Sequence, residues 1–258
     1  MMQQNFRHSE ILEIARREGR VTVENLADRF GVTVQTIRRD LTDLTEAGRL
    51  TRVHGGAVLP SGLVNIAYQD RRGLNANAKA RIAQRVADLI PNGASLFLNI
   101  GTTTEEVAQA LAHHEELLVV TNNMNVANIL TTHPGCEVIV TGGTVRPSDG
   151  GLIGHMTLRM IEQFSLDYAV IGCSALDVDG DVLDFDVAEV SISQTMLARA
   201  RNSMLVADHD KFLRNAPARI AALENIDVFV TDKAPPGALM QRAKRWKTQI
   251  EIADLSAI

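Results

Sequence analysis

Four short polar segments between residues 99 and 175 carry the residue types best suited to hold an anion. Gly101-Thr102-Thr103-Thr104 follows an apolar run. Glycine lets a ligand approach the backbone there, while threonine hydroxyls and helix N-terminal amides can bind a phosphate dianion. Three segments repeat this arrangement after later apolar runs: Thr121-Asn122-Asn123, Thr141-Gly142-Gly143 and Gly172-Cys173-Ser174. One such segment is typical of an ordinary strand-to-helix turn, but four in succession predict a pocket.

Charged and amide side chains elsewhere could complete this pocket. Lys211, just after Val206-Ala207-Asp208, could supply a positive charge, and Arg146 and Glu189 are weaker candidates. Asn99 lies immediately before the first polar segment and is expected to contact a ligand hydroxyl. The predicted ligand-binding residues are Asn99, Gly101, Thr102, Thr103, Thr121, Asn122, Asn123, Gly142, Gly143, Ser174, Glu189 and Lys211.

A second group, near the N-terminus, is suited to reading DNA bases. In a helix that begins after Thr33, Gln35 and Arg39 lie opposite the apolar Ile37 and Leu41. Glutamine and arginine make bidentate contacts with adenine and guanine in the major groove. Four further residues are better placed for phosphates, and Thr33 can cap the helix. The predicted DNA-binding residues are therefore Thr33, Gln35, Thr36, Arg38, Arg39, Arg52 and His54.

The elements that must position this group form a winged helix-turn-helix over residues 1–59. Helical spacing predicts helices over residues 7–18 and 23–30, which end at Gly19 and Gly31, and a third helix from Thr33 to Gly48. Residues 49–53 alternate, and Gly55-Gly56 turns the chain back into residues 57–59 as a small hairpin. A solvated helical hairpin with a charged face is the alternative.

Residues 60–77 have weak periodicity and small, polar residues, so we interpret them as a linker. From residue 78 to 258 apolar runs alternate with helical patterns, which predicts a mostly parallel α/β domain. The expected strands cover 94–100, 117–120, 138–140, 168–171, 204–206 and 228–230, and the expected helices lie near 79–90, 104–112, 124–131, 155–163, 187–201 and 237–246. The polar segments then meet at the carboxyl ends of the strands, where such sheets bind ligands.

Charge and composition agree with a DNA-binding region joined to a different domain. The net charge is −5, but residues 1–72 hold eleven arginines against nine carboxylates, which leaves −7 for the remainder. Apolar residues make up 45 % of the chain, and the two cysteines are too few for a disulfide framework or a cysteine zinc site. We expect a cytoplasmic protein with no membrane span, metal site or cofactor.

Several motifs together resemble the DeoR-type family of transcriptional repressors. The first is the N-terminal signature Arg7…Ile11, residues 33–41 and His54-Gly55-Gly56-Ala57. The resemblance continues through Lys79…Ile82-Ala83, Ile100-Gly101-Thr102-Thr103, Thr121-Asn122-Asn123, Gly142-Gly143, Gly151…Gly154 and Asp208…Lys211-Phe212. It implies a sensor domain that resembles ribose-5-phosphate isomerase, a homo-oligomer bound to double-stranded operator DNA, and a phosphorylated effector held by Gly101, Thr102, Thr103 and Lys211. The resemblance is closer at residues 119–128 and 149–154, and what it implies there is glycerol 3-phosphate as the favoured effector.

Two departures from the family pattern bear on function. Asn99 stands where the family commonly has aspartate, and residues 191–194 lack the basic residues common after the position of Glu189. Isomerisation needs a carboxylate base at the substrate carbon, so Asn99 disfavours an isomerase-like enzyme and predicts no catalytic residues. The remaining alternative is a transcriptional activator, because the sequence does not show whether polymerase is blocked or recruited.

Overall fold

The structure is a computed structural model that describes residues 2–18, 20–53, 55–58 and 68–253. The chain divides into two compact units, residues 1–64 and 65–258. The predicted linker therefore differs in its second half: residues 68–77 form helix α4 (Tyr68–Gly73) and the first residues of α5 (Ala76–Leu89) within the second unit. Side-chain hydrogen bonds from Tyr68 and Asn75 to that unit account for the difference, because hydrophobic periodicity does not record polar contacts.

The first unit contains the predicted three helices and a hairpin. Its elements are α1 (Met2–Glu18), β1 (Arg20–Thr22), α2 (Val23–Phe30), α3 (Val34–Glu46), β2 (Thr51–Val53) and β3 (Gly56–Val58). The Thr22 side chain accepts a hydrogen bond from the Asn25 N–H at 3.3 Å and so caps α2. Strand β1 joins the hairpin in the order β1-β3-β2, and Gly56 is required because a Cβ there would lie 1.9 Å from the Val21 carbonyl oxygen. Ile11, Leu26, Ile37, Leu41 and Leu44 form the core of this unit.

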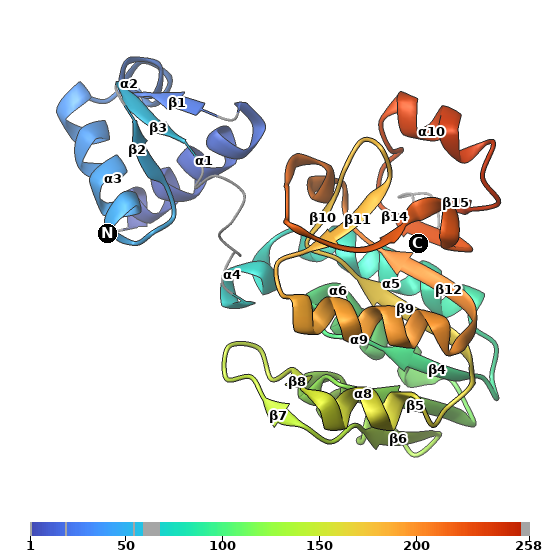
Figure 1. Cartoon of the computed structure of the whole chain (residues 1–258). Helices are drawn as coiled ribbons and strands as arrows, with labels where there is room; N and C mark the ends of the chain where they lie inside the picture. Colours follow the sequence, from blue (N-terminus) through green and yellow to red (C-terminus); the bar gives the residue numbers. More distant parts are fainter. Residues whose placement is uncertain (1, 19, 54, 59–67, 254–258) are drawn as a thin grey trace. The chain divides into compact units, whose positions relative to one another are not determined.

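A seven-stranded sheet forms the centre of the second unit (Figure 1). Its neighbouring strands are parallel throughout. In spatial order they are β15 (Gln249–Ile252), β14 (Val228–Thr231), β12 (Ala200–Val206), β9 (Leu166–Gly172), β4 (Ser95–Leu98), β5 (Leu117–Thr121) and β6 (Cys136–Val140). The parallel sheet is the predicted one, with β15 added at its edge.

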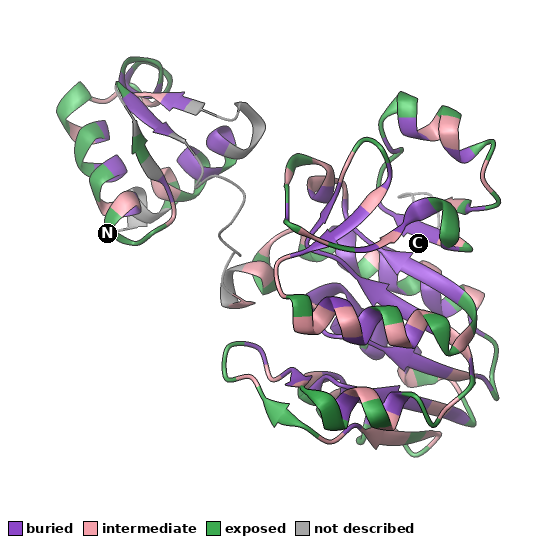
Figure 2. Cartoon of the chain, in the orientation of Figure 1, coloured by how far each residue is buried: buried purple, intermediate pink, exposed green. Residues whose placement is uncertain are grey.

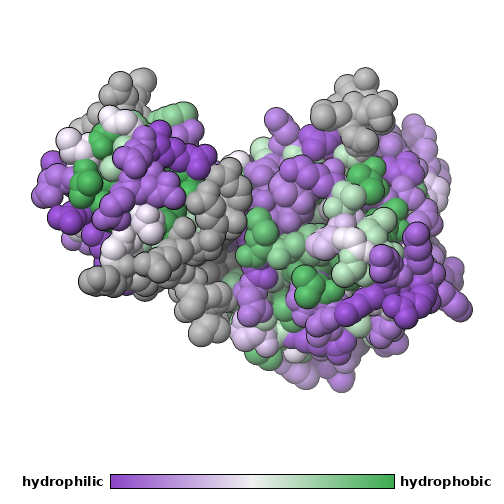
Figure 3. All heavy atoms as spheres, turned by 90° about the horizontal axis from the view of Figure 1, so that it is seen from above, coloured by the Kyte–Doolittle hydropathy of each residue, from purple (hydrophilic) through white to green (hydrophobic). Residues whose placement is uncertain are grey.

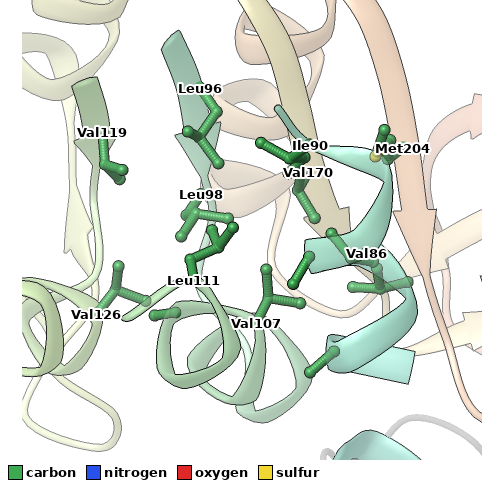
Figure 4. Close-up of a cluster of buried hydrophobic side chains, with 14 of the residues drawn as sticks. Val86, Ile90, Leu96, Leu98, Val107, Leu111, Val119, Val126, Val170 and Met204 are labelled. Carbon is green, nitrogen blue, oxygen red and sulfur yellow. The ribbon is translucent and has the colours of Figure 1, made fainter. Parts of the chain in front are cut away.

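Helices cover both faces of the sheet, which is buried between them (Figure 2). Strand β4 shows why: Leu96 and Leu98 pack with α5, α6 (Thr102–Ala110) and α7 (Met124–Leu130), as Figure 4 shows for the labelled side chains. Phe97 points to the opposite core, beside α8 (His155–Ile161) and α9 (Val187–Ala198). This alternation is the two-residue period of a strand with two buried faces.

Short antiparallel pairs were missed in the sequence because two to five residues give little periodicity. Strands β7 (Thr144–Val145) and β8 (Leu152–Ile153) form a hairpin, and β10 (Ala175–Leu176), β11 (Asp181–Asp184) and β13 (Ala218–Ala222) form a small sheet. The short helix η2 (His209–Leu213) follows β12, and α10 (Gly237–Ala243) follows β14. Within the described residues, no helix combines the length and the apolar character that crossing a membrane requires.

Candidate functional site

Helix α3 presents the predicted DNA-reading residues on its exposed face. Thr33 caps the helix, and its hydroxyl accepts the Thr36 N–H at 3.2 Å. Ile37 and Leu41 are fully buried, so the helix has one fixed orientation in its unit. On the opposite side the structure leaves the side chains of Gln35, Arg38 and Arg39 exposed, and Thr36 half-buried.

The wing residues are only partly covered by the structure. Arg52, on β2, is exposed, whereas His54 lies outside the described residues. Strands β2 and β3 pair antiparallel, with Arg52 opposite Ala57. The arrangement of α2, α3 and this hairpin is the winged helix-turn-helix that the sequence predicts.

A buried ion pair beneath α3 was not predicted. Asp40 is 1 % exposed and accepts hydrogen bonds from the Nε and Nη2 atoms of Arg7 at 2.7 and 3.1 Å. His8 Nε2 lies 3.2 Å from the same carboxylate. The hydrogen bonds between Arg7 and Asp40 raise the pKa of Arg7. Asp40 follows Arg39, so this contact to α1 fixes the helix segment that carries the reading face. The family signature includes both Arg7 and Asp40, but hydrophobic spacing alone gives no sign of their contact.

In the second unit, the ligand-binding crevice is expected where the chain order of the strands reverses. The chain runs from β4 outward to β5 and β6, and then returns to β9 on the other side of β4. The switch point therefore lies between β4 and β9. The loops after these strands contain Asn99 to Gly101 and Gly172 to Ser174, which are two of the four predicted segments.

The segment after β4 has the geometry of an anion-binding turn. Gly101 precedes the first residue of α6, and Thr102, Thr103 and Thr104 are all buried at that helix end. Their N–H groups lie in the first turn, where a helix offers no internal acceptors, and the helix dipole favours a negative charge there. The Thr104 hydroxyl donates to the carbonyl oxygens of Asn99 and Gly101 at 2.8 Å each, so it holds the turn.

Asn99 is buried at the switch point, but much of its amide is used within the protein. Its Oδ1 accepts the Gly172 N–H at 2.9 Å, and its Nδ2 donates to the Ser193 hydroxyl at 3.1 Å. Asn99 thus joins the loops after β4 and β9 to α9. The expected contact with a ligand hydroxyl remains a prediction, and these internal bonds leave one amide hydrogen for it.

In the segment after β5, two side chains make hydrogen bonds that hold the fold and one keeps an oxygen without a partner in the described part of the chain. The Thr121 hydroxyl donates to the Leu98 carbonyl at 2.7 Å and accepts the Asn123 N–H at 3.0 Å. The Asn123 side chain caps α7 by accepting the Asn125 N–H at 2.9 Å. Asn122 donates to the Leu152 carbonyl at 3.1 Å, while its buried Oδ1 has no partner among the described residues. Asn122 is therefore the member of this segment that retains a free acceptor.

The segments after β6 and β9 contribute backbone geometry. The Gly142 carbonyl accepts the Thr157 hydroxyl at 2.7 Å. Gly143 has φ 134°, and a Cβ there would lie 2.2 Å from Thr157 Oγ1, so the close packing of α8 at this point requires glycine at position 143. Ser174 is buried, and its N–H donates to the Leu183 carbonyl at 3.0 Å.

Glu189 is paired with Arg146 in a network at the loop that joins β7 to β8. The same guanidinium donates to both oxygens of Asp149 at 2.9 and 2.7 Å and to Asp186 at 2.6 Å. Burial alone lowers the pKa of Arg146, but its hydrogen bonds and ionic contacts with Asp149 and Asp186 leave the pKa raised. Arg146, a weaker candidate in the sequence, therefore holds the hairpin against the start of α9.

Lys211 belongs to a cluster of cations that the sequence reasoning only partly found. Lys79 and Lys211 are both buried. Each is attracted by the carboxylate of Asp208 and repelled by the cations of Arg71 and Arg214, and Lys211 also repels Lys79. Burial is the largest influence on both lysines: it lowers the pKa of Lys79 to about 8 and lowers that of Lys211. The missed members have sequence signals, because Arg71 belongs to the Asp70-Arg71-Arg72 charge cluster and Lys79 to the family motif.

One group of described residues has spacing that could hold a metal ion: Asp208, His209 and Asp210. Its donor atoms are engaged by neighbours. Asn75 Nδ2 donates to Asp208 at 3.0 Å and to Asp210 at 2.8 Å. The two ring nitrogens of His209 lie 2.8 Å from Asp232 and 3.0 Å from Lys233 Nζ. These bonds favour a structural network at this edge.

Comparisons with known proteins find one family domain in each of the two units. A model of the DeoR-like helix-turn-helix domain matches residues 7–62, and a model of the DeoR C-terminal sensor domain matches residues 74–233. The glycerol-3-phosphate regulon repressor of Escherichia coli is 44 % identical over 97 % of this chain and 100 % of its own length. The transcriptional repressor CsqR of Escherichia coli is 41 % identical over 96 % of this chain and 94 % of its own length.

Among solved structures, a ribose-5-phosphate isomerase in complex with phospho-erythronic acid has a TM-score of 0.41 at 14 % identity, covering 53 % of this chain and 54 % of its own. That likeness is too distant to bear on activity. The two family models together span most of the chain, and the relatives match it along nearly its full length. With a winged helix-turn-helix ahead of a parallel α/β sensor domain, the chain belongs to the DeoR family of transcriptional regulators.

Proposed function

We propose that this chain is a repressor that binds operator DNA through α3 and the β2–β3 wing and leaves it when a phosphorylated polyol or sugar binds the crevice. Glycerol 3-phosphate is the favoured effector. The observation that carries the proposal is the burial of two lysines, Lys79 at 3 % and Lys211 at 8 % exposure, in one cluster with Arg71, Arg214 and Asp208.

The electrostatics of this cluster favour a dianion. Burying an ammonium group without full neutralisation is costly, and the lowered pKa values of Lys79 and Lys211 record that cost. A phosphate would supply the missing negative charge and accept hydrogen bonds from both lysines. The N–H groups at the start of α6 offer further hydrogen-bond donors, and their partial positive charge also favours an anion. An uncharged polyol supplies none of this compensation, so the phosphate is the required part of the effector.

The DNA side of the proposal depends on exposure and on the type of contact each residue can make. Gln35 and Arg39 are assigned to base edges, whereas Arg38 and Arg52 are assigned to phosphates. Thr33 caps the helix, and its hydroxyl oxygen lies 2.9 Å from that of Thr36, which is assigned to a phosphate. His54 is assigned to the wing from the sequence.

Two relatives bear on the choice of effector and on the absence of catalysis. The repressor of the glycerol-3-phosphate regulon supports glycerol 3-phosphate, while CsqR, at 41 % identity, carries no effector in its name. Both relatives are named as repressors, which supports a non-enzymatic role. Asn99 supports it as well, because it provides no carboxylate base and its amide is held by Gly172 and Ser193.

Self-association is part of the proposal, since two copies related by a two-fold axis would match inverted operator half-sites. The second unit exposes large apolar side chains at Val145, Met156, Val178, Val187 and Leu213, each at least 50 % exposed. Figure 3 shows apolar residues gathered on one face of this unit. Such surfaces are typical of protein contacts.

The test is operator binding measured with and without glycerol 3-phosphate, glycerol, fructose phosphates and deoxyribose phosphate. Glycerol 3-phosphate should weaken operator binding by a factor that corresponds to about 1–3 kcal/mol of coupling, and glycerol should not. Lys211→Gln should abolish this response, while Lys244→Gln, at an exposed position, should retain it. Equal operator affinity at saturating concentrations of every phosphorylated compound would refute the proposal, as would turnover of a sugar phosphate. Operator position relative to the promoter distinguishes repression from activation.

A further inference from the structure

Helix α4 is the first described element of the second unit, directly after residues 59–67, which join it to the winged helix. It has six residues, too few to be stable as an isolated helix. Its conformation must therefore come from the surfaces it contacts, which belong to α6, to the first turn of α7 and to the loop between β7 and β8.

One anchor of α4 is a hydrogen-bond network centred on Tyr68. Its hydroxyl donates to Glu105 Oε2 at 2.8 Å and accepts from Asn125 Nδ2 at 3.0 Å. Glu105 is 5 % exposed, and its other oxygen accepts from Asn123 at 3.3 Å and from Asn125 at 3.1 Å. Tyr68 thus connects α4 to the first turns of α6 and α7, which begin just after two of the predicted ligand-binding segments.

The second anchor is Arg71, which is held loosely. Its guanidinium lies 3.7 Å from Asp149, and its buried Nε has no hydrogen-bond partner among the described residues. Its main-chain carbonyl accepts a hydrogen bond from Lys79 Nζ. A ligand that draws on Lys79 therefore competes with, or reorients, a bond that holds α4. Arg71 can turn toward the same charge at small cost because its present contacts are incomplete.

Space for such a movement exists next to the helix. A cavity of about 230 Å³ is lined by Tyr68, Arg72, Thr102 and Glu105, together with residues of α7. A second, of about 440 Å³, is lined by Gly73, Asn75 and Arg81, among others. Cavities thus adjoin both the Tyr68 end of α4 and the turn that follows it.

We propose that α4 is a ligand-responsive strap: its Tyr68 hydroxyl positions it on Glu105 and Asn125, and occupancy of the crevice changes how it is held and so transmits effector binding toward the winged helix. This inference rests on the proposed function, because it explains how that response leaves the sensor. Tyr68 is a positioning residue and makes no contact with effector. The coupling free energy then depends on the difference between two arrangements of α4.

The test uses the full chain and the variant Tyr68→Phe, with Tyr168→Phe as the matched control, since Tyr168 lies on β9 and has no part in this network. Three quantities are measured: effector affinity without DNA by calorimetry, operator affinity with and without saturating glycerol 3-phosphate, and amide hydrogen exchange of residues 68–73. In Tyr68→Phe, effector affinity should change less than about threefold, while the effect of ligand on operator affinity should shrink by at least about threefold. Tyr168→Phe should match the wild type in both, and ligand should alter exchange in α4 of the wild type.

The outcomes separate the two proposals. If no phosphorylated compound alters operator affinity of the wild type, the proposed function fails and the strap fails with it. If the wild type responds but Tyr68→Phe responds equally, or if ligand leaves exchange of α4 unchanged, the strap alone is wrong. A loss of effector affinity that accounts for the whole loss of response would also overturn it, since that would make Tyr68 part of the ligand site.

Discussion

At the scale of single residues, Asn99 shows how a departure in the sequence becomes interpretable once its partners are known. Its two amide atoms satisfy the Gly172 N–H and the Ser193 hydroxyl inside a buried site. An aspartate could still accept from Gly172, and the Ser193 hydroxyl could turn to donate. The fold would therefore accommodate the exchange, but a negative charge would be added near the proposed phosphate site.

Asn99→Asp is accordingly expected to weaken binding of glycerol 3-phosphate by at least about tenfold, or 1.4 kcal/mol. Unit charges 4 Å apart interact by about 4 kcal/mol at an effective dielectric constant of 20, and less at greater separation. Operator affinity without effector should stay the same, and no sugar phosphate should be isomerised, because one carboxylate does not make an acid–base pair. Calorimetry, operator titration and a turnover assay measure these three effects. Unchanged effector affinity would place Asn99 outside the electrostatic reach of the ligand.

Arg38 and Arg39 are neighbours in the sequence, and we expect them to make different kinds of contact with DNA. Arg39→Ala should cost about 1–3 kcal/mol of discrimination between operator and a mutated operator, because it removes a bidentate base contact. Arg38→Ala should weaken binding to both sequences alike. The slope of log affinity against log salt concentration should become less steep by about one, because one phosphate contact is lost. Both side chains are exposed, so thermal stability should hardly change. Titrations of the two DNA fragments over a range of salt concentrations distinguish the roles, and wild-type discrimination in Arg39→Ala would contradict this placement.

The buried lysines predict the pH dependence of effector binding. Burial lowers the pKa of Lys79 to about 8, and a bound dianion favours its protonated form and so raises that pKa again. Binding therefore takes up a proton above pH 8, and affinity should fall as pH rises from about 8, by up to tenfold per unit. Without ligand the sign is opposite: a lysine with a lowered pKa makes the folded state more stable as pH rises from 8 toward its ordinary 10.5.

Calorimetry between pH 7 and 9.5, together with denaturation over the same range, measures both trends. Lys79→Gln should bind more weakly at neutral pH and lose most of the pH dependence. A wild-type affinity that is flat across this range would exclude the buried lysines from the site.

At the scale of elements, the sequence predicted what periodicity and capping residues encode. Thr33 caps its helix as expected, and the central strands carry continuous apolar runs because both faces are buried. The sequence pattern predicts a linker at α4 because the contacts of this helix are polar. Polar contacts leave no hydrophobic periodicity by which a helix could be predicted. The β7–β8 hairpin was missed because its strands have only two residues each. We expect its stability to depend on Arg146, which pairs with Asp149 in the hairpin loop and with Asp186 from a separate segment of the chain.

Arg146→Ala tests that dependence. It would leave the carboxylates of Asp149, Asp186 and Glu189 beside one another without their cation, and breaking such a partly buried network should cost about 2–4 kcal/mol. Arg159→Ala is the matched control, because Arg159 is 69 % exposed and lies 4.0 Å from Glu162, a surface pair worth little. Trp246, the single tryptophan, lies in the second unit, so its fluorescence during denaturation reports on the unfolding of the unit that contains Arg146. Equal stability of the two variants would show that the hairpin does not depend on Arg146.

At the scale of the whole molecule, each unit has its own core. The core of the first unit contains residues 11–57, while those of the second begin at Ile82, so neither needs the other for burial. The proposed DNA contacts all lie in the first unit and the proposed effector contacts in the second. The covalent route between the two sets of proposed contacts enters the second unit at α4, which is where the proposed strap lies.

This separation predicts the behaviour of a fragment that begins at residue 65. It retains α4, the cation cluster and all strands of the sheet, so it should fold and bind glycerol 3-phosphate within about twofold of the full chain. It should not bind operator, because α3 and the wing are absent from it. In the full chain, operator DNA should lower effector affinity by the same factor by which effector lowers operator affinity, since linkage is reciprocal. Adding operator DNA to the fragment should leave its effector affinity unchanged. Calorimetry of both proteins with and without DNA makes the comparison, and a fragment that folds but binds no effector would mean that residues before 65 contribute to the ligand site.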